Sequence, residues 1–315
     1  MRCAVQAPAK IILLGEHWVV HGSKAVAAAV GLYARVQGQK AKQGIVVSSK
    51  NLGIVEDLTS CRRFCNLWEA AQYIAANVSR RPWPARIHIE SDIPIGAGMG
   101  SSAAVAVAFS ACYAVLGGIK PSLDLVLRAA YEAEKIVHGN PSGIDNTVST
   151  IGGFVLYRRG ENPIRLNNVS LERTKLLIID TGIPRSTKIA VNIFSTRLKA
   201  LNGLGESLLE LMNQVVDEAI TALRKDDAAK LGLLLDLSHG LLNAMGVSHE
   251  ALETAIHIAR RNGAYGAKLT GAGMGGTAIA LVPSEKASSI SSLLREGGFR
   301  VFEVEIGVNG FRILS

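Results

Sequence analysis

The chain has 315 residues, of which 48% are hydrophobic and 19% charged, and its formal net charge is +8 at pH 7. This composition excludes a disordered chain, and the length suits one large domain or two tightly joined ones. The basic residues form no long run and aromatic residues are only 5%, so we expect no nucleic acid partner. A small anionic molecule is the partner class that the charge favours.

The N-terminal stretch does not have the pattern of a signal peptide, because Pro8 and Lys10 interrupt it. The apolar segment 103–116 is shorter than the roughly 20 residues that span a bilayer. We therefore expect no membrane association and a cytoplasmic location. The cysteines fit that compartment: Cys61 and Cys65 have no second ligand pair nearby, so free or core thiols are predicted instead of a zinc site.

Apolar periodicity predicts mixed strands and helices in the first half of the chain. Strands are expected at 2–7, 10–14, 45–48, 86–90, 154–157 and 175–180, and helices at 66–78, 102–116 and 122–137. Segment 24–37 fits a helix or a strand. In the second half, helices are expected at 187–199, 204–224, 227–243, 249–261 and 284–296, with strands at 277–282 and 300–306. The change near residue 170 predicts two domains, 1–170 and 171–315, of mixed α/β (α+β) class.

A glycine-rich loop precedes the apolar helix at 102–116. Its residues are Gly96, Ala97, Gly98, Met99, Gly100, Ser101 and Ser102. Glycines allow a tight turn and a close approach to a ligand, and the helix start offers N–H groups to an anion. This pattern predicts a phosphate-binding loop, although it lacks the Gly-Lys-Ser/Thr of a Walker A loop. The alternative is a plain turn with a serine N-cap.

A second glycine stretch, 268–276, matches the dinucleotide-binding pattern at Gly271, Gly273 and Gly276. That pattern requires a following helix, whereas the next residues predict a strand. We therefore expect a backbone turn near the first glycine loop, and no dinucleotide.

The helix predicted at 122–137 carries Glu134 beside its apolar stripe. An inward carboxylate is costly to bury unless a cation or a donor meets it. Mg²⁺ and a buried salt bridge would both serve, and the pattern alone does not choose between them.

Asp145 follows in the loop predicted at 138–146, after a proline and two glycines. An aspartate near a phosphoryl acceptor can accept the hydroxyl proton, but an Asx-turn is its ordinary role in a loop. Lys10, at a strand start, would stabilise charge on a phosphate or simply lie at the surface.

These segments occur in the order found in GHMP kinases, and the resemblance covers nearly the whole chain. Segments 8–17, 94–103 and 268–276 resemble the three family motifs, with Met99 where leucine is usual. Within the superfamily, 15–22 and 138–146 resemble the mevalonate kinase form. Segment 185–188 resembles a family segment near the active site, to which we assign no role.

The resemblance implies a two-domain GHMP kinase fold with the active site in the cleft between the domains. ATP would bind the 96–102 loop, and Ser102 and Glu134 would hold Mg²⁺. Asp145 would be the catalytic base and Lys10 its charged neighbour. The remaining implied residues line a mevalonate pocket: Glu16, His17 and Tyr157. A homodimer stays open as the assembly.

Three alternatives remain at this point. The first is a sister GHMP kinase that acts on phosphomevalonate or on the 3-hydroxyl of mevalonate. The second is a non-catalytic sensor with the same fold, which the presence of Lys10, Ser102, Glu134 and Asp145 disfavours. The third is a dinucleotide oxidoreductase, suggested only by the glycines at 271–276.

Overall fold

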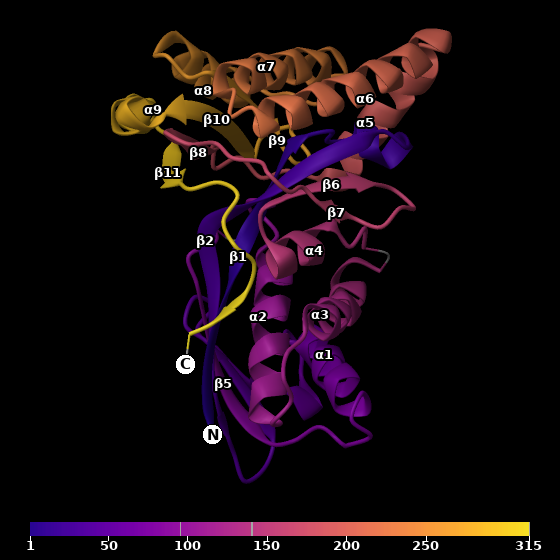
Figure 1. The fold of residues 1–315 in the computed structure, drawn as a ribbon, viewed down its shortest axis with the longest axis vertical. Coiled ribbons are helices and arrows are strands. Elements are labelled where there is room, and N and C mark those ends of the chain that lie inside the picture. Colours follow the sequence, from indigo (N-terminus) through magenta and orange to yellow (C-terminus); the bar gives the residue numbers. More distant parts are fainter. Residues whose placement is uncertain (95, 140, 315) are drawn as a thin grey trace.

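Figure 1 shows the computed structural model, which describes residues 1–94, 96–139 and 141–314. Ile95 and Asn140, which belong to two of the segments singled out above, lie outside the described residues. An N-terminal module is built around one sheet and a C-terminal module around another. The two modules lie end to end along the long axis of the molecule.

The N-terminal sheet has the strand order β12-β1-β2-β5-β3-β4, with β6 beside β2 and β7 beside β6. Its strands are β1 (Arg2–Leu14), β2 (Lys24–Lys40), β3 (Ile45–Ser49), β4 (Ile54–Asp57), β5 (Ala85–Ser91), β6 (Phe154–Arg158), β7 (Ile164–Arg165) and β12 (Arg312–Ile313). The two strands predicted around Pro8 are one strand, β1. The pairing register with β2 shifts between Pro8 and Ala9, which absorbs the proline within a continuous ladder.

Helices cover one face of this sheet (Figure 1). They are α1 (Cys65–Ala76), α2 (Ser101–Leu116), α3 (Leu123–His138) and α4 (Ile144–Ile151), with short 3-10 turns η1 (Trp18–His21) and η2 (Leu58–Ser60). The helix α2 lies at the centre, in contact with β1, β2, α1, α3 and α4, which explains why nearly all of its side chains are buried. The predicted helices at 66–78, 102–116 and 122–137 are confirmed.

The C-terminal module is an antiparallel sheet of order β11-β8-β10-β9, with helices packed on it. Its strands are β8 (Thr174–Asp180), β9 (Gly266–Thr270), β10 (Thr277–Pro283) and β11 (Arg300–Val304). Its helices are α5 (Thr187–Ala200), α6 (Gly203–Arg224), α7 (Ala228–Ala244), α8 (Glu250–Arg261), the 3-10 turn η3 (Ser284–Lys286) and α9 (Ala287–Glu296). Within the described ranges, no helix is both long and apolar enough to cross a membrane.

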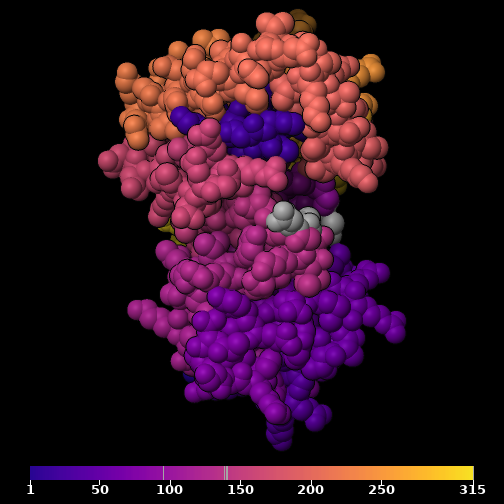
Figure 2. All heavy atoms as spheres, turned by 90° about the vertical axis from the view of Figure 1, so that its right-hand side faces the viewer, coloured from indigo at the N-terminus to yellow at the C-terminus, as the bar shows by residue number. Residues whose placement is uncertain are grey.

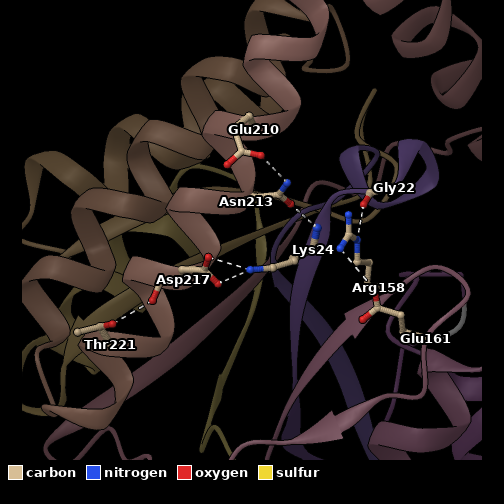
Figure 3. Close-up of polar contacts among 8 residues, drawn as sticks. All are labelled: Gly22, Lys24, Arg158, Glu161, Glu210, Asn213, Asp217 and Thr221. Carbon is tan, nitrogen blue, oxygen red and sulfur yellow. Dashed lines mark hydrogen bonds and ion pairs between the residues drawn. The ribbon is translucent and has the colours of Figure 1, made fainter.

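The start of β2 is attached to α6, and this joint connects the two modules (Figure 3). The backbone N–H of Lys24 donates to Asn213 Oδ1 at 2.9 Å, and its ammonium lies 2.8 Å from both carboxylate oxygens of Asp217. The Ser23 hydroxyl donates to the Leu209 carbonyl at 3.1 Å. A second link is the C-terminal strand β12, which returns to the N-terminal sheet and pairs with β1.

The free-thiol prediction is wrong for two of the four cysteines. Cys61 and Cys65 form a disulfide, with their Cα atoms 5.1 Å apart. Cys61 follows the turn η2 in an extended conformation and Cys65 begins α1, so the two cysteines do not lie on one helix. Cys3 and Cys112 are free and buried, as predicted.

Candidate active site

The glycine loop before α2 has a backbone that favours glycine. Gly96, Gly98 and Gly100 have φ angles of 78°, 68° and 70°, in the left-handed region that other residues rarely adopt. Gly100 is the N-cap of α2, and no side chain caps the helix there. The first-turn N–H groups and the positive end of the helix dipole are therefore available to an anion.

The predicted pair Ser102 and Glu134 is brought together by α2 and α3. The Ser102 hydroxyl donates to Glu134 Oε1 at 2.6 Å, and Glu134 is only 2% exposed. The inward orientation predicted for Glu134 is thus confirmed. A hydroxyl oxygen and a carboxylate are hard oxygen donors of the kind that Mg²⁺ prefers.

Lys10 and Asp145 form an ion pair next to the glycine loop. Lys10 Nζ lies 2.8 Å from Asp145 Oδ1, and the lysine side chain is nearly buried whereas the aspartate is one-third exposed. Asp145 belongs to the first turn of α4, so the predicted loop ends earlier, at Gly143. A Cβ atom built on Gly100 would lie 3.5 Å from Asp145 Oδ2, so the loop and the ion pair are direct neighbours.

The second glycine stretch packs against the first, as predicted. The Thr277 hydroxyl donates to the Ala97 carbonyl at 3.1 Å. The strand β10 follows Gly276 directly, so the setting of a dinucleotide-binding turn is absent at this described segment.

Arg185 lies between the two glycine stretches, and sequence reasoning assigned it no role. Its guanidinium donates to the Thr270 carbonyl at 3.2 Å. A Cβ atom on Gly98 or on Gly276 would overlap its side chain, at 1.6 Å and 2.6 Å respectively. Burial lowers the pKa of Arg185 and Asp180 opposes this shift, but a guanidinium remains a cation near neutral pH. The position suits contact with phosphate groups bound on the first loop.

Glu16 and His17 form a buried turn after β1. Glu16 is 1% exposed and pairs with Lys268, whose ammonium lies 2.5 Å from Glu16 Oε1. His17 Nε2 donates to the Ala272 carbonyl at 2.9 Å, and its ring stacks on Phe194. Burial is the main cause that lowers the pKa of His17, so the imidazole is neutral at pH 7.

Tyr157 contributes from β6, on the α4 side of the site. Its hydroxyl donates to the Ser142 carbonyl at 3.2 Å, two residues before α4 begins. Tyr157 also lines a cavity of about 380 Å³ together with Val19, Val20, Pro141, Ser142, Arg159 and Gly160. Figure 2 shows where the two modules meet: residues from the start of the chain, in indigo, lie between the orange and salmon C-terminal helices and the magenta residues below them.

Family models match both halves of the chain. The model of the GHMP kinases N terminal domain matches residues 66–153, and that of the GHMP kinases C terminal matches residues 219–298. The chain is a GHMP kinase. The residues that the N-terminal family model matches include the glycine loop, Glu134 and Asp145. Those that the C-terminal family model matches include Lys268 and the second glycine stretch.

Relatives named as mevalonate kinases align over the full length of this GHMP kinase. The protein from Aeropyrum pernix is 35% identical, with 98% of this chain and 97% of the relative covered. That from Pyrococcus furiosus is 33% identical, with coverage of 99% and 98%. The structure of L. major mevalonate kinase in complex with R-mevalonate is 27% identical, covers 96% of this chain and 95% of its own, and has a TM-score of 0.82. The predicted family and the two-domain α/β fold are confirmed.

Proposed function

We infer that this GHMP kinase transfers the γ-phosphoryl group of ATP to the 5-hydroxyl of (R)-mevalonate, giving 5-phosphomevalonate and ADP in the mevalonate route to isoprenoids. The observation that carries the inference is the full-length similarity to mevalonate kinases, combined with the site in this chain. A glycine loop, a hydroxyl–carboxylate pair and a Lys–Asp pair meet there.

In this proposal Asp145 is the catalytic base. Its one-third exposed carboxylate accepts the proton of the acceptor hydroxyl while the oxygen attacks phosphorus. The Lys10 ammonium orients that carboxylate and lies beside the position where negative charge develops. Because phosphoryl transfer depends mainly on positioning and electrostatics, the fixed ion pair supports these roles.

The N–H groups of the 96–102 loop and the start of α2 bind the ATP phosphates, and Arg185 adds a cation from the opposite side. Ser102 and Glu134 fit Mg²⁺ and would hold it, since it is commonly bound by one or two protein oxygens together with substrate phosphates. The described residues contain no cluster of three or more His, Cys, Asp and Glu side chains that could hold a metal by themselves. The ion would supply charge neutralisation on the phosphates.

We assign Glu16, His17 and Tyr157 to the acceptor pocket. Glu16 Oε2 and His17 Nδ1 are buried and, among the described residues, have no hydrogen-bond partner. Such atoms suit the hydroxyl groups of an acceptor. We propose that the site lies in a cleft between domains 1–170 and 171–315, and the strand β12 pairs within the sheet of the first domain. A cytoplasmic location completes the proposal, and a homodimer stays open as the assembly.

A coupled assay of ADP release tests the proposal, with mevalonate compared against phosphomevalonate, galactose and homoserine. We expect mevalonate to have the highest kcat/KM, and ³¹P NMR to place the phosphate on the 5-oxygen. A preference for phosphomevalonate, or a phosphate on the 3-oxygen, would assign a sister reaction. If none of these compounds leads to ADP release, both kinase functions are contradicted and the non-catalytic sensor is favoured.

A further inference from the structure

Lys268 is a fully buried lysine that joins the two modules. It belongs to β9, its side chain has no exposed surface, and its ammonium donates to Glu16 Oε1 at 2.5 Å and to the Leu269 carbonyl at 2.6 Å. Removing an ammonium and a carboxylate from water is costly, so a pair of this kind is weak evidence for stability. The pair is therefore better explained by a function at the place where it lies than by stability.

The pair lies at the acceptor pocket proposed above. The segment that contains Lys268 holds β1 and its following turn at two further points. The Thr270 hydroxyl donates to the Ile12 carbonyl at 2.8 Å, and the Ala272 carbonyl accepts from His17. Lys268 adds the only charged contact of the three.

Glu16 presents its two carboxylate oxygens differently. Oε1 is occupied by Lys268, whereas Oε2 is buried and has no hydrogen-bond partner among the described residues. His17 Nδ1, in the next residue, is in the same state. Buried polar atoms without partners are rare and call for a ligand, water or other explanation. An acceptor hydroxyl at Oε2 would complete this turn.

An acceptor that is itself an anion would need a counter-charge to Glu16 in this pocket. A hydroxy acid such as mevalonate carries a carboxylate, and an uncompensated Glu16 carboxylate in the same pocket would repel it. Charges interact strongly across a buried site because little water screens them. With the Lys268 ammonium in contact, the pair is electrically neutral and still leaves Oε2 as an acceptor of a hydrogen bond.

We propose that Lys268 is a positioning residue that sets acceptor specificity: by cancelling the Glu16 charge, it allows the turn at 15–17 to bind the hydroxyl groups of an acceptor that is itself an anion. This inference rests on the proposed function of the same site. It predicts that loss of the ammonium raises the KM of negatively charged acceptors more than the KM of uncharged ones.

The other titratable groups around the pair do not provide this charge balance. His17 adjoins Glu16, and His239 of α7 lies behind β9, where its Nδ1 accepts from Leu269 N–H and its Nε2 lies 3.1 Å from Glu253. Burial is the main cause that lowers the pKa of both imidazoles from 6.5, so both are neutral above that pH. Burial also lowers the pKa of Lys268, and the Glu16 charge opposes that shift.

The test compares mevalonate with its uncharged methyl ester as acceptors for wild type, Lys268→Met and Glu16→Gln/Lys268→Met. The readout is the ratio of KM for the acid to KM for the ester at neutral pH. In Lys268→Met we expect this ratio to rise about tenfold or more, because the Glu16 carboxylate has lost its ammonium partner.

The double variant replaces the pair by uncharged side chains of similar size, which a fold commonly tolerates. We expect its ratio to return close to the wild-type value, even where both KM values rise. Thr270→Val is the matched control, since it removes a contact between β9 and β1 without changing a charge. It should leave the ratio unchanged.

Two results would overturn the proposal. One is an unchanged acid-to-ester ratio in Lys268→Met. The other, decisive even if that single variant does not fold, is a double variant whose ratio differs from that of wild type. Wild-type enzyme that does not turn over mevalonate would instead contradict the proposed function, so the two failures are distinguishable.

Discussion

Asp145 and Lys10 lie on different elements, and their ion pair borders the glycine loop. We predict that Asp145→Asn lowers kcat by about two orders of magnitude or more, because the amide cannot accept the hydroxyl proton. The Kd for ATP should change little. Asp217→Asn is the matched control, because Asp217 pairs with Lys24 at the exposed joint between the modules and should not affect turnover. Near-normal kcat in Asp145→Asn would remove this residue from the role of base.

Glu134 is the second residue whose proposed role has a specific signature. We predict that Glu134→Gln raises the Mg²⁺ concentration for half-maximal activity by about tenfold or more, since a neutral amide is a weaker ligand than a carboxylate. The measurement is a Mg²⁺ titration at saturating ATP and mevalonate. Glu132→Gln, on the same helix but paired with Lys135 at the surface, is the control. Equal titrations for both variants would exclude Glu134 as a ligand.

Residues whose burial or role follows from their near neighbours in the sequence could be predicted. Glu134 falls beside an apolar helical stripe, and that pattern alone indicated burial, which the structure confirms. Lys268 and Arg185 could not be predicted in the same way. A lone lysine in a short strand usually lies at the surface, and its partner Glu16 is 252 residues away in the chain. The position of Arg185 depends on how closely the two glycine stretches pack, which no local pattern encodes.

At the scale of elements, the two glycine stretches differ in why they need glycine. Gly273 has φ +75° and a Cβ atom there would lie 2.0 Å from the Val247 carbonyl oxygen, whereas Gly96 has φ +78° and open space around it. We predict that Gly273→Ala lowers the free energy of unfolding by about 3 kcal/mol or more, and Gly96→Ala by only about 1–2 kcal/mol. Urea unfolding measures both. Equal losses would mean that backbone conformation alone decides the requirement.

Most helices could be predicted because their apolar residues repeat at helical spacing. Two strands and one helix show where the apolar pattern of the sequence does not identify the element. The start of β2 is buried on both faces, from Ala25 to Val30, so its alanines lack the alternation of a half-buried strand. The strand β9 is short and buried throughout, and was not predicted at all. The start of the helix α4 falls within the segment 138–146, which predicts a loop because it contains Pro141 and Gly143.

At the scale of the whole molecule, the modules share strands and contacts instead of a flexible linker. The strand β12 closes the N-terminal sheet, and Lys24 and Asn213 connect β2 with α6. We therefore predict one cooperative unfolding transition. The three tryptophans (Trp18, Trp68 and Trp83) all lie in the N-terminal module, and Trp18 packs edge-on against Phe194 of the helix α5. Their fluorescence therefore reports on the N-terminal module and on its contact with α5.

Far-UV circular dichroism includes the helices α5 to α9 of the other module, so a comparison of the two signals is informative. Their urea midpoints should coincide within error. Separate midpoints would show that each module unfolds on its own. Asp217→Asn should leave both midpoints nearly unchanged, because an exposed ion pair contributes only about 0–1 kcal/mol.

The pairing of β12 with β1 also brings the two ends of the chain together. Val5 pairs with Ile313, and the Leu314 N–H donates to the Ala4 carbonyl at 2.7 Å, so the N and C labels are neighbours in Figure 1. A peptide of a few residues would bridge the ends, and new ends could be opened at an exposed turn such as the one at Gly53. A circularly permuted enzyme could therefore be made. In such a variant a reporter domain could replace the peptide that joins the original N- and C-termini.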